Sequence, residues 1–196
     1  MSLTANALLH HVGTSDHNAS TCSWCEVIHS AHCNLQAWDL ATGRCEHTLI
    51  SHRDKVQALA WHPTEASCLL SGGFDKQALV SDLRTPNGAT AAWQCPEDVE
   101  SLAWNPHQPA TFVVSFEKGE VACYDTRKGA GAESVFTLAA HAKATTGMAF
   151  NPAAAGLLVT GSVDRTVRRC CSAAGMCSHK HFGVVNVVMS LSHWQL

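Results

Sequence analysis

The sequence repeats one short pattern at nearly regular spacing, and this repetition restricts what the chain can fold into. Trp61-His62-Pro63 returns as Trp104-Asn105-Pro106 and again as Phe150-Asn151-Pro152. Three aspartates, Asp39, Asp82 and Asp125, follow one another at steps of 43 residues. A fixed period in this range indicates a repeat architecture in which one supersecondary unit is used several times.

Short apolar segments bounded by Gly, Pro, Asp or Asn fill each repeat, which is typical of an all-β fold. The first full repeat predicts strands at 56–61, 68–72, 78–82 and 90–94, and the second at 99–104, 111–115, 121–124 and 134–139. The third predicts strands at 145–150, 157–161 and 166–169, and an incomplete earlier repeat predicts strands at 34–40 and 44–50. The Gly- and Ala-rich stretch 128–133 predicts a longer surface loop.

The repeats divide the chain into three parts. Residues 1–33 lack the pattern, and we expect them to be disordered. Residues 34–169 hold the repeats, which divide into 34–50, 51–94, 95–139 and 140–169. Residues 170–196 depart from the pattern, because Cys170 and Cys171 stand where an aromatic residue and an aspartate would follow.

Composition excludes several classes of protein. A hydrophobic content of 46% and a charged content of 15% are those of a globular chain. The formal net charge of −3 argues against a dedicated nucleic-acid binder, which would normally be basic. No run of 18 apolar residues occurs, so we expect no membrane-spanning segment, and the start of the sequence lacks the features of a secretory signal.

The ten cysteines do not resemble a disulfide framework. Cys45, Cys68, Cys95 and Cys123 occur singly, at repeat positions that otherwise hold small hydrophobic residues. We therefore expect these four to be reduced, mostly buried thiols of an intracellular protein.

Two sets of polar residues recur at the same spacing: His52, Ser71 and Asp75, and then His141, Thr160 and Asp164. With the Trp-Asp ending at 38–39, this pattern resembles the WD40 family of β-propellers, in which each repeat builds a four-stranded blade. The resemblance implies a partial propeller of three to four four-stranded blades, and a His–Ser/Thr–Asp hydrogen-bonded cluster in two of them. The family's Trp is replaced by Ser81 and Cys170, and the second repeat has Val114 and Lys118 in the Ser/Thr and Asp positions.

The clusters are explained by structure rather than by catalysis. An aspartate that caps a tight turn and accepts a hydrogen bond from a buried imidazole satisfies both polar groups. The sequence contains no Gly-x-Ser-x-Gly elbow, no Gly-rich phosphate loop and no His-Glu-x-x-His motif. We therefore expect no enzymatic activity, no cofactor and no small-molecule substrate.

Within the family, the string from Trp38 to Arg168 is most similar to a nuclear and nucleolar member associated with ribosome biogenesis and with chromatin at ribosomal RNA genes. The similarity rests on residues 52–57, 62–63, 70–76, 82–84, 136–138, 140–141 and 158–160. It implies a scaffold in the nucleus and nucleolus that binds other proteins, with direct nucleic-acid binding not expected. Because a propeller closes with about seven blades, we expect this chain to be a fragment of a longer propeller protein.

Exposed residues of the loops offer an alternative function. Arg84 and Arg127 each follow an aspartate by two residues, which resembles the box of WD40 substrate receptors of cullin-4 ubiquitin ligases. The simpler interpretation is that each arginine pairs with its own turn aspartate, Asp82 or Asp125. Turn position also predicts exposure for Arg53, Lys55, Phe116, Glu117 and Lys143.

Two Cys/His clusters suggest zinc. The first is Cys22, Cys25, His29 and His32 with Cys33, and the second is Cys170, Cys171, Cys177, His179 and His181. Cys-x-x-Cys can hold one tetrahedral ion, but a finger separates its ligand pairs by about 12 residues, whereas three residues separate Cys25 from His29. We therefore favour an accidental cluster in both places over a metal site.

Overall fold

The fold is all-β, as the repeats predict. A computed structural model describes residues 24–29, 33–39, 41–85, 89–173 and 176–177. These form four antiparallel sheets in which strands that follow one another in sequence are neighbours, and one 3₁₀ turn, η1 (Thr126–Lys128). Each sheet corresponds to one repeat and is called here a blade.

Blade A consists of β1 (Trp24–His29), β2 (Asn34–Asp39) and β3 (Arg44–Ile50). Blade B consists of β4 (Val56–Trp61), β5 (Cys68–Gly73), β6 (Gln77–Asp82) and β7 (Ala89–Gln94). Blade C consists of β8 (Val99–Trp104), β9 (Thr111–Phe116), β10 (Glu120–Asp125) and β11 (Phe136–Ala139). Blade D consists of β12 (Thr145–Phe150), β13 (Leu157–Ser162), β14 (Val167–Ala173) and β15 (Met176–Cys177).

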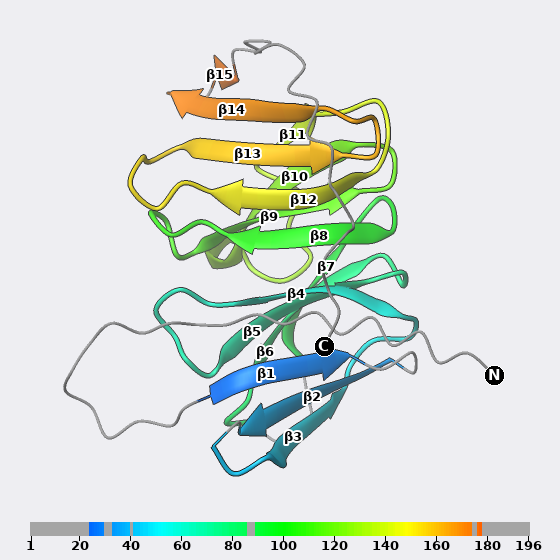
Figure 1. The fold of residues 1–196 in the computed structure, drawn as a ribbon, viewed down its shortest axis with the longest axis vertical. Coiled ribbons are helices and arrows are strands. Elements are labelled where there is room, and N and C mark those ends of the chain that lie inside the picture. The colour runs from blue at the N-terminus through cyan, green and yellow to red at the C-terminus, as the bar shows by residue number, and fades with distance from the viewer. Residues whose placement is uncertain (1–23, 30–32, 40, 86–88, 174–175, 178–196) are drawn as a thin grey trace, which may run out of the picture.

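The four blades stack in chain order along the long axis of the molecule (Figure 1). The first strands of successive blades are neighbours, with β4 beside β8 and β8 beside β12. This arrangement is part of a β-propeller, and the described strands form no closed ring. The described residues contain no helix long and apolar enough to cross a membrane.

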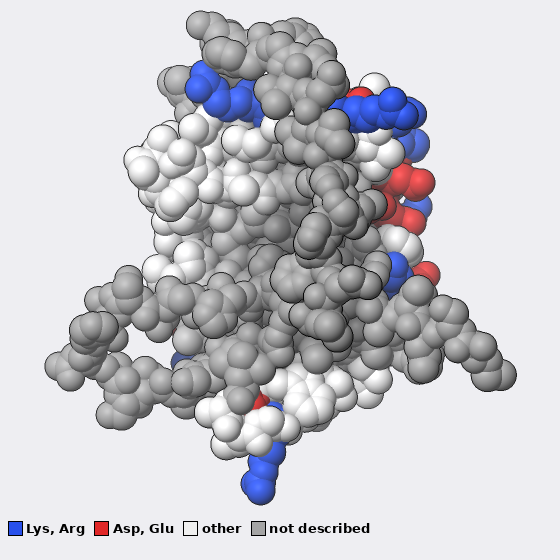
Figure 2. All heavy atoms as spheres, viewed as in Figure 1, with Lys and Arg blue, Asp and Glu red and all other residues white. Residues whose placement is uncertain are grey.

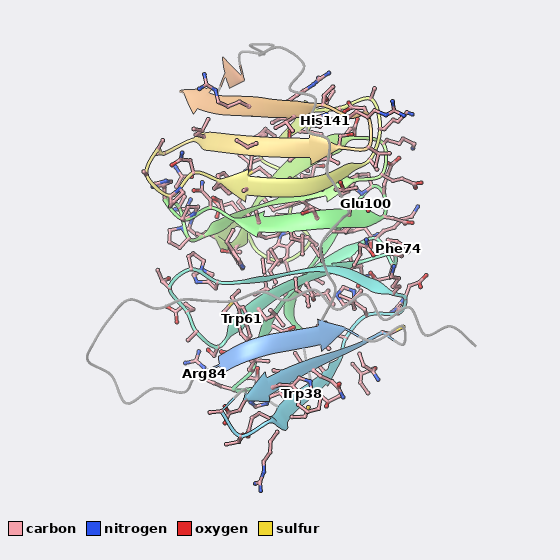
Figure 3. The ribbon with its side chains drawn as sticks, in the orientation of Figure 1. Trp38, Trp61, Phe74, Arg84, Glu100 and His141 are labelled. Carbon is pink, nitrogen blue, oxygen red and sulfur yellow. The ribbon has the colours of Figure 1, made fainter. Side chains whose placement is uncertain are left out.

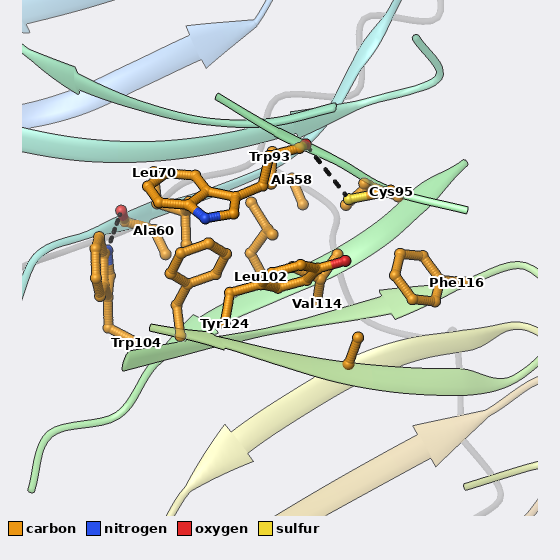
Figure 4. Close-up of a cluster of buried hydrophobic side chains, with 14 residues drawn as sticks. Ala58, Ala60, Leu70, Trp93, Cys95, Leu102, Trp104, Val114, Phe116 and Tyr124 are labelled. Atoms are coloured by element: carbon orange, nitrogen blue, oxygen red, sulfur yellow. Dashed lines mark hydrogen bonds between the residues drawn. The ribbon is translucent and has the colours of Figure 1, made fainter. Parts of the chain in front are cut away.

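The joint between blades B and C is the most aromatic part of the core (Figure 4). Trp93 of β7 meets Phe112 of β9 edge to face at 5.2 Å between ring centroids, and Phe112 stacks on Tyr124 at 5.5 Å. The indole of Trp104 donates a hydrogen bond to the carbonyl oxygen of Ala60 at 3.2 Å. The joint is therefore fixed by aromatic packing and by a directional bond between blades.

Side chains alternate across each blade, so equivalent positions face the next blade along the chain. Leu70 in blade B and Val113 in blade C occupy one such position and are almost completely buried. The equivalent Val159 in blade D is 36% exposed, and Val167 beside it on that face is 39% exposed. Blade D therefore presents a face that the other blades bury, because no described blade follows it.

The ends of the repeat region differ from expectation. Residues 24–29 were expected to be disordered, but they form β1, which pairs antiparallel with β2. β14 runs to Ala173, past the expected end at residue 169, and pairs with β15. In both places backbone pairing with a neighbouring strand extends the sheet where side-chain pattern gives no signal.

Two of the four cysteines expected to be buried are so. Cys95 and Cys123 lie in the core, Cys68 is half-buried, and Cys45 is exposed. The expectation was wrong for Cys45 because β3 is the outermost strand of blade A, where side chains meet solvent.

Candidate functional site

The blade B cluster brings together the three residues that the resemblance implies. His52 Nδ1 lies 2.9 Å from Asp75 Oδ2, and His52 Nε2 lies 2.8 Å from Ser71 Oγ. Asp75 also accepts the backbone N–H of Arg53 at 2.9 Å. Because a carboxylate only accepts, Nδ1 donates to Asp75, while Nε2 pairs with the Ser71 hydroxyl.

The blade D cluster has the same geometry. His141 Nδ1 lies 3.0 Å from Asp164 Oδ2, and Nε2 lies 2.9 Å from Thr160 Oγ1. The Thr166 hydroxyl donates to Asp164 Oδ1 at 2.6 Å, and the Thr166 N–H donates to it at 2.9 Å. Burial disfavours the ionised Asp164, but the hydrogen bonds from Thr166, His141 and the N–H of Ala142 outweigh it and hold its pKa well below the usual range.

These clusters offer no free reactive group. His52 and His141 are buried, and each ring nitrogen has a partner inside its own blade. Each aspartate joins the loop before the first strand to the turn between the second and third strands. We therefore assign to both clusters the task of holding loops to the blade.

Blade C replaces the cluster with different chemistry. Cys95 and Tyr124 occupy the His and Trp positions, and both side chains are buried in the B–C core. Burial raises the pKa of the Cys95 thiol to about 12, so it is not a reactive thiolate. At the position of the turn aspartate, Lys118 forms an ion pair with Glu97. In blade C the carboxylate therefore belongs to the loop before the first strand, and it holds the turn between the second and third strands from there.

The loops lie on two rims at opposite ends of the strands (Figure 3). The His–Asp rim consists of residues 51–55, 73–76, 95–98, 117–119, 140–144 and 163–166, and includes the labelled Phe74 and His141. The Asp–Arg rim consists of residues 62–67, 82–85, 105–110, 125–128 and 151–156, and includes the labelled Arg84. Figure 2 shows charged side chains gathered along the right-hand edge, where the labels of Figure 3 place the His–Asp rim.

On the Asp–Arg rim, both arginines pair with their own turn aspartates. Arg84 Nη2 lies 2.7 Å from Asp82 Oδ2, and Arg127 Nη2 lies 2.7 Å from Asp125 Oδ2. Each aspartate also accepts the backbone N–H of its arginine at 3.0 Å. The Arg127 guanidinium lowers the pKa of Asp125 to about 2, and Arg84 holds the pKa of Asp82 low in the same way. Both guanidinium groups remain exposed on the rim.

Four of the five predicted rim residues reach the surface of the His–Asp rim. Arg53, Glu117 and Lys143 are exposed, and Lys55 is half-buried with its ammonium 5.0 Å from the ring centroid of Phe74. The prediction that Phe116 is exposed is wrong, because its side chain is completely buried in the B–C core. β9 continues one residue further than expected, so alternation turns Phe116 inward.

Sequence reasoning missed two histidines that join neighbouring blades at the Asp–Arg rim. His62 Nε2 lies 3.0 Å from the carbonyl oxygen of Pro109, which joins blade B to blade C. His107 Nε2 lies 2.9 Å from the carbonyl oxygen of Asn151, which joins blade C to blade D. Their position beside the repeated Pro of the first turn was the available signal.

Most side chains of the two Cys/His clusters are not among those that the structure describes. Cys22, His32, His179 and His181 lie outside the described residues, and the side chains of Cys25, His29, Cys171 and Cys177 are not among those described. Among the residues that the structure describes, no group of three or more His, Cys, Asp or Glu could hold a metal ion.

Known proteins match this chain over the repeats. The family model described as "WD domain, G-beta repeat" matches residues 43–82 and 132–168. Periodic tryptophan protein 1 homolog of Drosophila melanogaster is 27% identical over 134 residues, 67% of this chain and 29% of the relative. Periodic tryptophan protein 1 of Saccharomyces cerevisiae is 27% identical over 146 residues, 71% of this chain and 25% of the relative. GATOR2 complex protein WDR24 of Danio rerio is 30% identical over 134 residues, 67% of this chain and 17% of the relative.

Proposed function

The chain is a WD40-repeat chain carrying part of a β-propeller, and we propose that it acts as a non-enzymatic scaffold that binds other proteins through its loop rims. The proposal rests on one observation: the repeated polar residues form their hydrogen bonds inside their own blades. His52 and His141 are buried and bonded within their blades, which leaves the exposed rims as the surfaces for recognition.

We propose further that these partners belong to ribosome biogenesis in the nucleus and nucleolus, through rRNA processing or ribosomal DNA chromatin. Two relatives are periodic tryptophan protein 1 or its homolog, and the motifs at 52–57 and 70–76 carry the same resemblance. This chain spans 29% and 25% of those two relatives. The GATOR2 complex protein WDR24 shows that a similar repeat also occurs in a different assembly.

Cell fractionation tests the proposal. The epitope-tagged chain, expressed in cultured cells, is expected in the nucleolus and, on a sucrose gradient of nuclear extract, in the pre-ribosomal fractions. Reversing two charges of the His–Asp rim, Arg53→Glu with Lys143→Glu, should remove it from those fractions, whereas Lys128→Glu, on the opposite rim, should not. Sedimentation only as free protein, for the unaltered chain, would contradict the ribosomal assignment.

The paired arginines support a second candidate, a substrate receptor of a cullin-4 ubiquitin ligase. Arg84 and Arg127 present equivalent exposed guanidinium groups on adjacent blades of one rim, each oriented by its own aspartate. Such a pair offers planar donors to a partner's carboxylates. Binding of the purified chain to the ligase adaptor, lost in the Arg84→Ala, Arg127→Ala double variant, is what this candidate requires. No binding by the unaltered chain would dismiss it.

A further inference from the structure

A groove of about 650 Å³ lies between blades C and D, on the side of the Asp–Arg rim. Its floor is continuous with the core of the C–D joint, because Val113, Cys123, Leu158 and Cys170 belong to both. One side is formed by β11, where Phe136 is 38% exposed. None of the residues that line the groove is Lys, Arg, Asp or Glu.

Comparison of the two neighbouring joints explains why the groove exists. Strand register places Leu138 in blade C at the position of Trp93 in blade B, because their partners Val121 and Ala78 are equivalent. Trp93 fills the B–C joint, where it packs edge to face on Phe112. Leu138 is too small to fill the C–D joint in the same way.

The side of the C–D joint that blade D contributes also has smaller side chains. Blade D has Leu158 at the position of Phe112 and Cys170 at the position of Tyr124. Phe112 and Tyr124 stack on each other in the B–C joint, where both are buried. The C–D joint therefore lacks the aromatic side chains that close its neighbour, and the space they would fill is open to solvent.

β11 supplies a second element of recognition. It is the edge strand of blade C and pairs only with β10 among the described strands. The outer side of an edge strand carries backbone N–H and C=O groups that can pair with an added strand. Val135, just before β11, is 47% exposed and extends the apolar surface at this edge.

We propose that this groove binds an extended peptide segment of a partner protein, which adds to the edge of β11 and inserts one aromatic side chain between blades C and D. The aromatic anchor follows from the side chains that fill the same space in the B–C joint, and an uncharged anchor follows from the uncharged lining. The inference rests on the proposed scaffold function, because it names the chemistry of one partner of that scaffold.

Fluorescence anisotropy on purified components tests it. The probe is a fluorescein-labelled seven-residue peptide, Thr-Val-Thr-Trp-Thr-Val-Thr, and its control has Ala in place of Trp. We expect saturable binding of the Trp peptide, at least tenfold weaker binding of the Ala peptide, and slower hydrogen exchange at residues 136–139 on binding. This experiment needs no cellular partner, so its outcome is independent of the cell fractionation. The peptide can fail to bind while the chain is nucleolar, and the peptide can bind while the chain is not nucleolar.

Filling the groove supplies the matched variants. Leu138→Trp rebuilds the side chain of the B–C joint and should weaken the Trp peptide at least tenfold. Val163→Trp adds the same side chain at an exposed position of the opposite rim and should leave binding unchanged. If circular dichroism shows that Leu138→Trp does not fold, Cys170→Tyr fills the groove from blade D instead.

The proposal is overturned by no saturable binding of the Trp peptide, by equal binding of the Ala peptide, or by unchanged binding to a folded, filled variant. It is also overturned if light scattering shows a dimer of the unaltered chain that Leu138→Trp dissociates, because the occupant would then be a second copy of the chain.

Discussion

Glu97 and Lys118 hold the blade C turn in the arrangement opposite to that of the neighbouring blades. The Glu97 carboxylate accepts the backbone N–H of Lys118 at 3.2 Å and also pairs with the Lys118 ammonium. In blade D the turn residue Asp164 itself accepts, from the loop residue Ala142. The carboxylate has thus moved from the turn to the loop, while the link between loop and turn remains.

This exchange predicts unequal effects of the two side chains. Glu97→Ala removes both the backbone cap and the ion pair, so it should lower the free energy of unfolding. Lys118→Ala removes only an exposed ion pair that solvent screens, so it should lower the free energy of unfolding less. Urea denaturation of both variants measures the difference, and a Lys118→Ala cost equal to or above that of Glu97→Ala would contradict the capping role.

Thr160 tests the buried cluster. Thr160→Val keeps the shape but leaves His141 Nε2 without its partner, so the free energy of unfolding should fall by about 1–3 kcal/mol. Thr160→Ser retains the hydroxyl and should cost clearly less. Equal losses for the two variants in chemical denaturation would show that the hydrogen bond is not what stabilises the loop.

Asp164 predicts a dependence of stability on acid. Its pKa in the folded chain lies below the value of about 3.9 expected in the unfolded chain. Its contribution is therefore fully present above about pH 4 and is lost as the pH falls through the folded pKa. The stability advantage of the unaltered chain over Asp164→Asn should be constant from pH 7 to pH 5 and shrink below pH 4. An advantage that grows towards low pH would have the wrong sign.

Gly119 and Gly129 have nearly the same φ angle but different surroundings. Substituting each by alanine therefore distinguishes backbone strain from steric crowding of the added Cβ. Gly119 has φ of +90° and Gly129 has φ of +92°. A Cβ on Gly119 would lie 2.4 Å from the carbonyl oxygen of His141, whereas one on Gly129 would meet nothing within 4 Å. Both alanine variants carry the backbone penalty of about 1–3 kcal/mol. Gly119→Ala should lose more in thermal denaturation, and equal losses would mean that blades C and D approach less closely at this point.

Val113 and Val159 occupy one repeat position in two environments. Val113 is 1% exposed between blades C and D, and Val159 is 36% exposed on the open face of blade D. Val113→Ala should lower the free energy of unfolding by about 2 kcal/mol, and Val159→Ala by less than about 1 kcal/mol. A Val159→Ala cost as large as that of Val113→Ala would mean that the face of blade D is covered in solution.

Repetition made most of the fold predictable. The strands at 56–61, 99–104 and 145–150 agree with β4, β8 and β12 at both ends, because each has the same turn residues around it. The resemblance to WD40 repeats implied the two His–Ser/Thr–Asp clusters, and the structure brings the residues of each cluster together. Local sequence therefore decides the strands, whereas the clusters were recognised through the resemblance.

What could not be predicted depends on contacts between elements. β1 has no side-chain pattern of its own and exists through pairing with β2. Phe116 was predicted to lie on the surface, next to a turn. β9 instead continues one residue further than expected, and the side chain of Phe116 points into the core. The C–D groove depends on how Leu138 and Cys170, contributed by different blades, fill one joint. A comparison of side-chain size at equivalent positions would have pointed to it.

Hydrogen exchange measured by mass spectrometry on the purified chain tests most directly whether four stacked blades support the rims. The middle strands β5, β9 and β13 pair on both sides, so we predict that their amides exchange far more slowly than those of the 128–133 loop. Residues 24–29 should also be protected, by pairing with β2. Exchange that is uniformly fast throughout β5, β9 and β13 would contradict the account, because no rigid frame would then present the rims.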